Sequence, residues 1–85
     1  MRLTIYSRPG CHLCDQMKSI VHRVIAKDGD EARIEVDEID ISTDRELLDR
    51  YGLEIPVLMI DGKKVAKYRV SEQELTQMVK ARTGS

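Results

Sequence analysis

The chain has 85 residues, with hydrophobic residues at 41% and charged residues at 34%. This size and balance are typical of one globular domain, residues 1–85, with a modest core, and they exclude a disordered chain. Lys and Arg number 14 against 15 Asp and Glu, a net charge of -1 that gives no general attraction to nucleic acid or acidic membranes. No apolar run is long enough for a transmembrane helix, and no apolar signal region precedes the first predicted strand. We therefore expect a cytoplasmic protein, whose thiols stay mostly reduced.

The first half of the chain predicts a strand, a helix and a second strand. Residues 3–6 are β-prone and end at the Pro-Gly pair of residues 9–10. From Cys11 onward, apolar residues recur three and four positions apart, which predicts a helix with one buried face. Gly29 is expected to end this helix in the left-handed conformation. Residues 33–37 alternate apolar and polar, as in a half-buried strand.

A second helix is predicted next, and a strongly apolar strand after it. Thr43 and Glu46 fit a capping box, in which the hydroxyl and the carboxylate each accept a backbone N–H of the first turn. Gly52 is expected to end the helix. Residues 56–60 read Pro-Val-Leu-Met-Ile, and the proline opens the strand where its missing N–H does least harm.

The last part of the chain predicts a hairpin and a third helix. Asp61-Gly62 is a two-residue turn signal, because a type I′ turn needs positive φ at both positions. Residues 63–68 form the returning strand, and Ser71 with Glu74 form a second capping box. The resulting order β-α-β-α-β-β-α predicts an α/β domain with a mixed four-stranded sheet flanked by helices.

The chain contains two cysteines, Cys11 and Cys14, at the start of the first predicted helix. As a structural disulfide, the pair would close a loop of about four residues and join no second element, so it would stabilise little. As half of a zinc site, it lacks partners, because His12 lies between the cysteines and His22 lies more than two helical turns beyond them. The haem-attachment pattern fails because Asp15 stands where a histidine is needed.

The third interpretation, a reactive dithiol, fits the position of the pair best. Unpaired N–H groups and the helix dipole at a helix N-terminus favour a thiolate at Cys11, and the thiolate is the nucleophile. Arg8 and His12 are candidates to add positive charge there. Cys14, one turn deeper, is expected to stay a protonated thiol and to resolve the mixed disulfide that Cys11 forms.

Three stretches give the chain a resemblance to a known family: T-I-Y-S-R-P-G-C-H-L-C from residue 4, E-I-P-V-L at 54–58 and I-D-G-K at 60–63. They resemble the glutaredoxin branch of the thioredoxin-like superfamily. The resemblance implies a thioredoxin fold and thiol–disulfide oxidoreductase activity in electron transport and cell redox homeostasis. It also implies that Arg8 takes the place of a lysine that touches glutathione. Ile55-Pro56 corresponds to the family's cis-proline segment, where the Ile55 backbone would pair with a substrate beside Cys11.

The chain departs from this family in two places. His12-Leu13 stands where glutaredoxins usually have Pro-Tyr, and residues 65–70 replace a Gly-Gly pair and acidic residues that hold glutathione. Side chains in place of the two glycines would narrow the groove in which glutathione closely approaches the backbone. We therefore do not expect tight glutathione binding of the usual kind, and the chain fits a C-x-L-C type of glutaredoxin-like protein.

The leading functional hypothesis is a monomeric dithiol oxidoreductase without a metal or a bound cofactor. Cys11 and Cys14 would be catalytic, and Arg8, His12, Ile55 and Pro56 would bind the substrate, a disulfide-containing protein or a small thiol. Electrons would come from glutathione, a flavin reductase or another thiol protein, with no nucleic acid or membrane partner. Two alternatives stay open: an iron–sulfur carrier in which two copies share a cluster through Cys11, and a non-catalytic interaction domain.

Overall fold

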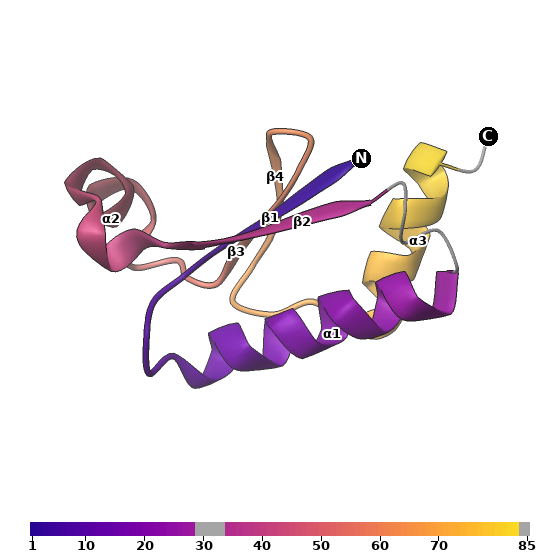
Figure 1. Ribbon diagram of the computed structural model, residues 1–85, viewed down its shortest axis with the longest axis horizontal. Helices are drawn as coiled ribbons and strands as arrows, with labels where there is room; N and C mark the ends of the chain where they lie inside the picture. The colour runs from indigo at the N-terminus through magenta and orange to yellow at the C-terminus, as the bar shows by residue number, and fades with distance from the viewer. Residues whose placement is uncertain (29–33, 84–85) are drawn as a thin grey trace.

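The computed structural model describes residues 1–28 and 34–83. Its elements follow in the order β1 (Arg2–Ser7), α1 (His12–Asp28), β2 (Glu35–Asp40), the 3₁₀ helix η2 (Ile41–Thr43), α2 (Arg45–Tyr51), β3 (Val57–Ile60), β4 (Lys63–Lys67) and α3 (Glu72–Thr83). Figure 1 labels the four strands and the three α-helices. The predicted order β-α-β-α-β-β-α is confirmed, and η2 is an addition that the sequence did not predict. The expected helix stop at Gly29 lies outside the described residues.

The four strands form one mixed sheet in the order β2-β1-β3-β4. β1 and β2 are parallel, whereas β1 with β3 and β3 with β4 are antiparallel. In the β1–β3 pair, Leu3 lies opposite Ile60 and Tyr6 lies opposite Val57. A parallel pair needs a crossover, and α1 supplies it; the antiparallel pair β3–β4 needs only a tight turn. The predicted sheet is therefore confirmed.

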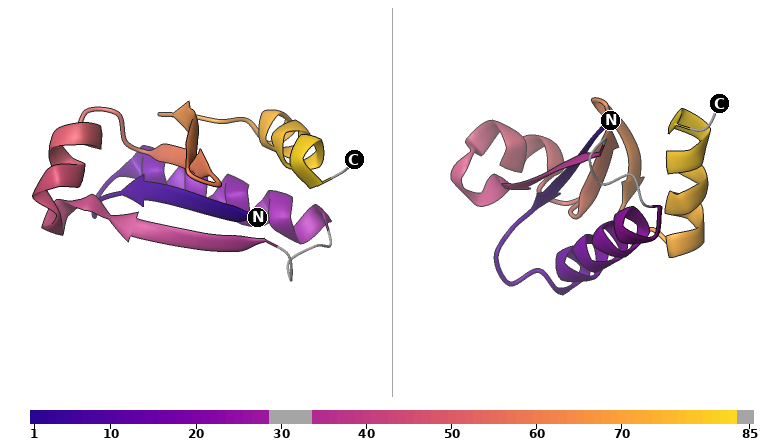
Figure 2. Two further views of the ribbon diagram at one scale, coloured as in Figure 1. Left: turned by 90° about the horizontal axis from the view of Figure 1, so that it is seen from above. Right: turned by 45° about the vertical axis from the view of Figure 1, so that its right-hand side comes forward.

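The core lies between the sheet and the two long helices. Figure 2 shows α1 and α3 together on one side of the sheet and α2 on the other side. The buried cluster joins alternate residues of β1 and β3 to the apolar faces of α1 and α3, and it also includes one residue before β2 and one before α3. Its members are Leu3, Ile5, Met17, Val21, Val24, Ile25, Ile34, Leu58, Ile60, Val70, Leu75 and Val79. Among the described residues, no helix combines the length and the apolar character needed to cross a membrane.

The predicted hairpin turn and the predicted cap of α3 are confirmed, whereas the predicted cap of α2 is wrong. Asp61 (φ 48°) and Gly62 (φ 84°) both adopt positive φ in the predicted hairpin turn. Ser71 Oγ accepts the N–H of Glu74 at 3.0 Å, and Glu74 accepts the N–H of Ser71 at 3.1 Å, so this capping box is confirmed. The expected cap at Thr43 is wrong. Thr43 ends η2, and the next residue, Asp44, caps α2 by accepting the N–H of Leu47 at 3.1 Å.

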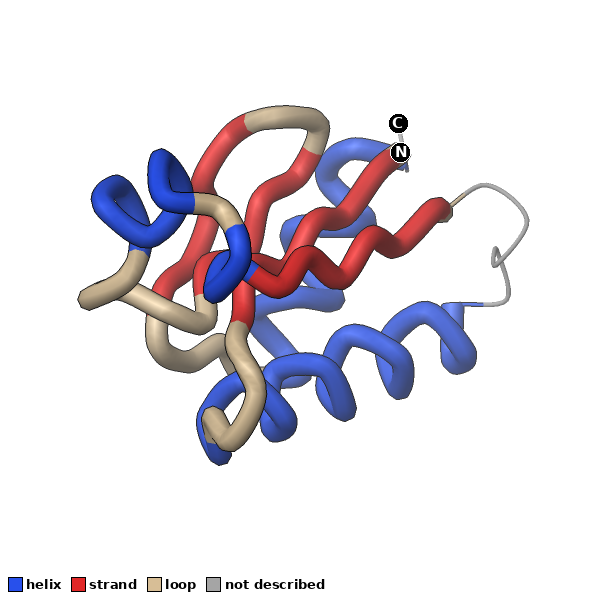
Figure 3. Tube along the Cα trace, turned by 60° about the vertical axis from the view of Figure 1, so that its left-hand side comes forward, coloured by secondary structure: helices blue, strands red, loops and turns tan. Residues whose placement is uncertain are grey.

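Three connections meet at one end of the sheet, and they build the candidate site. They are the segments before α1, before β3 and after β4, drawn in tan in Figure 3. Two of them contain residues that the sequence singled out, Cys11 and Ile55-Pro56, and Cys14 follows in the first turn of α1. The N-terminus lies at the opposite end of the sheet (Figure 1).

Candidate functional site around Cys11 and Cys14

Cys11 occupies the N-cap position of α1. Its carbonyl accepts the N–H of Asp15 at 3.2 Å, which begins the helical hydrogen bonding. Its Sγ accepts the N–H of Cys14 at 3.1 Å, the bond that a capping oxygen would make in another protein. Gly10 has φ 77°, so the chain enters the helix through a conformation that favours glycine. The Pro-Gly pair thus directs the first sulfur to the helix N-terminus.

The two cysteine sulfurs are bonded to each other, and their surroundings differ. Cys14 is completely buried, whereas Cys11 is half-buried and faces the surface. The bond lies within the first turn of one helix and joins no second element. One sulfur is therefore open to a partner, while the other is shielded beneath it.

The segment before β3 lies next to this pair. The register of β1 with β3 pairs Tyr6 with Val57, which places Pro56 beside the end of β1, from which the chain runs to Cys11. The Ile55-Pro56 peptide bond is cis, as the resemblance implied. Tyr68 holds this segment from β4: its N–H donates to the Pro56 carbonyl at 2.8 Å, and its hydroxyl donates to the Leu53 carbonyl at 3.0 Å.

Arg8 and His12 flank the cysteines, both exposed. Arg8 lines a shallow hollow with Asp15, Lys18 and Asp40. The hydroxyl and N–H of Ser42, helped by the charge of Lys18, lower the pKa of Asp40, so this hollow carries charges of both signs near neutral pH. His12 begins α1, and its Nε2 lies 3.3 Å from Nε2 of Gln16.

The second histidine lies elsewhere. His22 Nε2 is 3.3 Å from a Glu38 carboxylate oxygen on β2, and both side chains are exposed. Within residues 1–28 and 34–83, no three His, Cys, Asp or Glu side chains form a group that would hold a metal ion.

Sequence reasoning missed two aromatic features of the site. Tyr6 of β1 stacks on Tyr51 of α2, with ring centroids 4.8 Å apart and planes 12° apart. Tyr68 makes the two hydrogen bonds to the segment before β3 and lies in the left-handed region, at φ 67°. Both are long-range pairings, so no local pattern of residues pointed to them. The one available signal was that residues 65–70, which include Tyr68, stand in place of a Gly-Gly pair and the acidic residues that follow it in glutaredoxins.

The comparison with protein families agrees with this geometry. A family model described as "Glutaredoxin-like domain (DUF836)" matches residues 2–80. The chain belongs to this glutaredoxin-like domain family. A glutaredoxin-like relative, "Glutaredoxin-like protein YDR286C homolog" of Dictyostelium discoideum, is 32% identical over 77 residues, which are 88% of this chain and 71% of the relative.

Solved structures place this glutaredoxin-like domain in the thioredoxin fold. The solution structure of target protein XcR50 from X. campestris has a TM-score of 0.74 and 29% identity, with 95% of each chain covered. Thioredoxin 1 from Thermosipho africanus TCF52B has a TM-score of 0.67 at 13% identity, with 96% of this chain and 93% of that chain covered, a likeness of fold alone. The chain is therefore a glutaredoxin-like domain of thioredoxin fold with a disulfide-forming cysteine pair.

Proposed function

We propose that this glutaredoxin-like domain is a cytoplasmic thiol–disulfide oxidoreductase that uses Cys11 and Cys14 as a dithiol. The observation that carries the proposal is the bonded pair at the N-terminus of α1, with Cys11 facing the surface and Cys14 buried. The N–H of Cys14 and the helix dipole both favour negative charge at the Cys11 sulfur. Cys11 is thus suited to attack a substrate disulfide, and Cys14 is suited to stay a protonated thiol until the mixed disulfide has formed.

The reaction transfers two electrons through a mixed disulfide. The Cys11 thiolate attacks one sulfur of a substrate disulfide, that S–S bond breaks, and the leaving sulfur departs as a thiolate that takes a proton from water. Cys14 then loses its proton to solvent, and its thiolate attacks the Cys11 sulfur. This step breaks the mixed disulfide, releases the second substrate sulfur as a thiolate that takes a proton from solvent, and leaves the Cys11–Cys14 disulfide. Two thiols of glutathione or of another donor reduce that disulfide and complete the cycle.

The remaining site residues have supporting roles in this proposal. The backbone of Ile55, next to Pro56, pairs with the extended chain of the substrate. Arg8 supplies positive charge to an anionic donor such as glutathione, and His12 adjusts the charge around Cys11. The domain acts as a monomer, without a metal or a bound cofactor, in cell redox homeostasis and electron transport.

The first test is equilibration of the protein in a series of glutathione redox buffers, followed by thiol alkylation and mass spectrometry. We expect conversion between the dithiol and the internal disulfide along a two-electron curve, with a midpoint between about -270 and -120 mV, the range of C-x-x-C proteins. Cys14→Ser should instead accumulate one glutathione adduct on Cys11, and Cys11→Ser should lose all disulfide exchange. Two free thiols at every oxidising potential, or full activity of Cys11→Ser, would contradict the proposal.

A further inference from the structure

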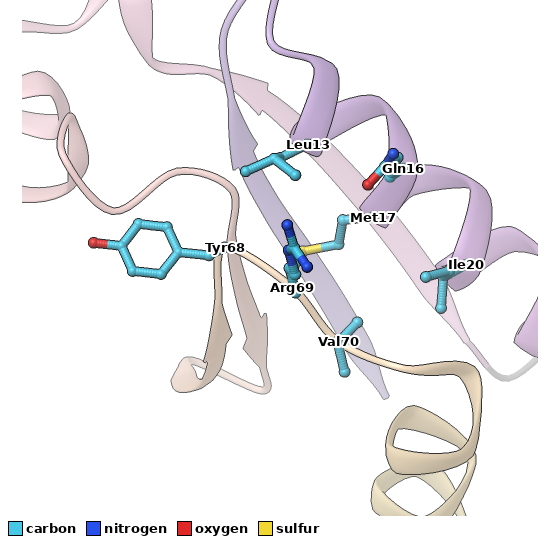
Figure 4. Close-up of a pocket in the computed structure, with 7 residues that line it drawn as sticks. All are labelled: Leu13, Gln16, Met17, Ile20, Tyr68, Arg69 and Val70. Atoms are coloured by element: carbon cyan, nitrogen blue, oxygen red, sulfur yellow. The ribbon is translucent and has the colours of Figure 1, made fainter.

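A pocket of about 120 Å³ lies beside the cysteine pair, between α1 and the connection from β4 to α3. One wall is a single face of α1, formed by Leu13, Gln16, Met17 and Ile20 at helical spacing. The other wall is the segment Tyr68, Arg69 and Val70. Figure 4 shows the Tyr68 ring directed away from α1, so Arg69 and Val70 present their side chains on that wall.

The pocket adjoins the cysteine site through two of its lining residues, Leu13 and Tyr68. Leu13 lies between Cys11 and Cys14 and forms one end of the lining. On the other wall, the N–H of Tyr68 donates to the Pro56 carbonyl at 2.8 Å. A chain bonded to Cys11 and passing along Pro56 therefore has its neighbouring side chains next to this pocket. Four of the seven lining residues are apolar, Leu13, Met17, Ile20 and Val70, and a volume of about 120 Å³ leaves room for one apolar side chain.

Arg69 gives this pocket a positive charge that the described residues do not neutralise. Its side chain is exposed, and no carboxylate of residues 1–28 or 34–83 lies within ion-pair distance of its guanidinium. The acidic residues that follow it in the chain have other partners: Glu72 binds Lys27 at 2.6 Å, and Glu74 accepts the N–H of Ser71. A guanidinium beside an apolar surface attracts a carboxylate.

We propose that this pocket selects a protein partner whose reactive cysteine lies next to an apolar residue and an acidic residue. The apolar side chain fills the space between Leu13, Met17 and Val70, and the acidic side chain pairs with Arg69. This inference rests on the proposed function and names its substrate class. Glutathione has carboxylates that could pair with Arg69, but it has no apolar side chain to fill the space between Leu13, Met17 and Val70.

The test uses a set of short peptides that share one sequence around a single internal disulfide. One peptide has a leucine and a glutamate beside the reactive cysteine; the others replace glutamate by glutamine or lysine, or leucine by serine. Reduction is measured as kcat/KM with the wild-type protein, Arg69→Gln and Lys63→Gln. Lys63, exposed at the start of β4, is a matched control that loses the same charge away from the pocket. Binding of the same peptides with serines in place of cysteines is measured by fluorescence anisotropy.

We expect wild-type protein and Lys63→Gln to prefer the glutamate peptide over the glutamine peptide by about 2- to 5-fold, the range of an exposed ion pair. Arg69→Gln should erase this preference. The preference should also fade between about 0.01 M and about 1 M salt, as the Debye length falls from about 30 to about 3 Å. The serine peptide should bind more weakly than the leucine peptide.

The two measurements separate this inference from the proposed function. Equal binding of all peptides, or an unchanged glutamate preference in Arg69→Gln, would overturn the pocket's role even if every peptide is reduced. Selective binding without reduction would instead support the pocket and overturn the oxidoreductase. Glutathione disulfide, reduced as fast as the leucine–glutamate peptide, would count against a protein partner.

Discussion

Tyr68 connects the end of β4 to the segment that precedes β3. Its backbone adopts φ 67°, a conformation that favours glycine, yet its hydroxyl and N–H bond the carbonyls of Leu53 and Pro56. These two bonds fix both ends of the Leu53–Pro56 segment to Tyr68, the residue that follows β4. A glycine at this position would satisfy the backbone but would lose the hydroxyl contact. The hydroxyl contact therefore gives a physical reason for a tyrosine in a backbone conformation that favours glycine.

Tyr68→Phe removes only the hydroxyl, and we expect it to lower the free energy of unfolding by about 0.5–1.5 kcal/mol. For a domain of this size, that loss lowers Tm by several degrees. Under the proposed function, KM for a disulfide peptide should rise, because the Ile55 backbone is held less firmly, while kcat changes less. Thermal unfolding and steady-state kinetics measure both effects. Tyr6→Phe is the control, since it keeps the ring that stacks on Tyr51; equal behaviour of the two variants would argue against a special role of the Tyr68 hydroxyl.

At the start of α2, the capping-box pattern in the sequence predicts the wrong N-cap residue. Thr43 and Glu46 match a capping box, but Asp44 is an equally good capping residue one position later. Three residues of η2 intervene, with Asp40 accepting the N–H of Ser42 at 2.8 Å, and they carry the chain one residue further before α2 begins. At α3, by contrast, Ser71 has no competing neighbour of this kind, and the predicted cap is the observed one.

Asp44→Ala should therefore lower the free energy of unfolding by about 0.5–2 kcal/mol, the usual cost of removing an N-cap side chain. Thr43→Ala should change it by a few tenths of a kcal/mol at most, because its hydroxyl does not cap α2 and surface changes of this kind are nearly neutral. Urea unfolding of both variants measures the difference. The reverse order of the two effects would restore Thr43 as the cap.

Glu72 joins the first turn of α3 to α1. Its carboxylate lies 2.6 Å from Nζ of Lys27 and 3.4 Å from a guanidinium nitrogen of Arg23. The hydrogen bond from Lys27 is the main cause that lowers the pKa of Glu72 below its ordinary value, and Arg23 adds to it. A lowered pKa in the folded state means that the contact stabilises the protein above the unfolded pKa of about 4.3 and is lost as the pH falls below it.

Glu72→Gln should accordingly be less stable than the wild-type protein at pH 7, and the gap should close as the pH falls through about 4. Urea unfolding at a series of pH values measures the gap. Asp49→Asn, at an exposed position of α2 for which no ion pair is seen among the described residues, removes one carboxylate away from the Glu72 contact and serves as the control. A gap that stays constant down to acid pH would mean that Glu72 acts through packing rather than charge.

For the whole molecule, sequence patterns predicted the elements better than the contacts between them. The cysteine spacing, the Asp61-Gly62 turn and the apolar strand at 57–60 are local, and each was found where expected. The stack of Tyr6 on Tyr51 and the pocket between α1 and Arg69 depend on how distant segments pack. The spacing of residues in the sequence does not predict such contacts, so the aromatic stack and the pocket could be identified only from the structure.

The Cys11–Cys14 disulfide is a local link, whereas the contacts that hold the sheet to the helices are long-range. The Cys11–Cys14 bond closes a loop of about four residues, for which the chain-entropy model gives about 2 kcal/mol. The cluster that joins the sheet to α1 and α3 includes neither cysteine. We therefore expect the reduced protein to unfold cooperatively, with a free energy of unfolding no more than about 2 kcal/mol below that of the oxidised protein. Urea unfolding with and without a reductant measures this difference. Loss of cooperative unfolding on reduction would show that the fold depends on the disulfide. A small decrease in the free energy of unfolding would mean that the bond can open and close as a redox pair while the fold is kept.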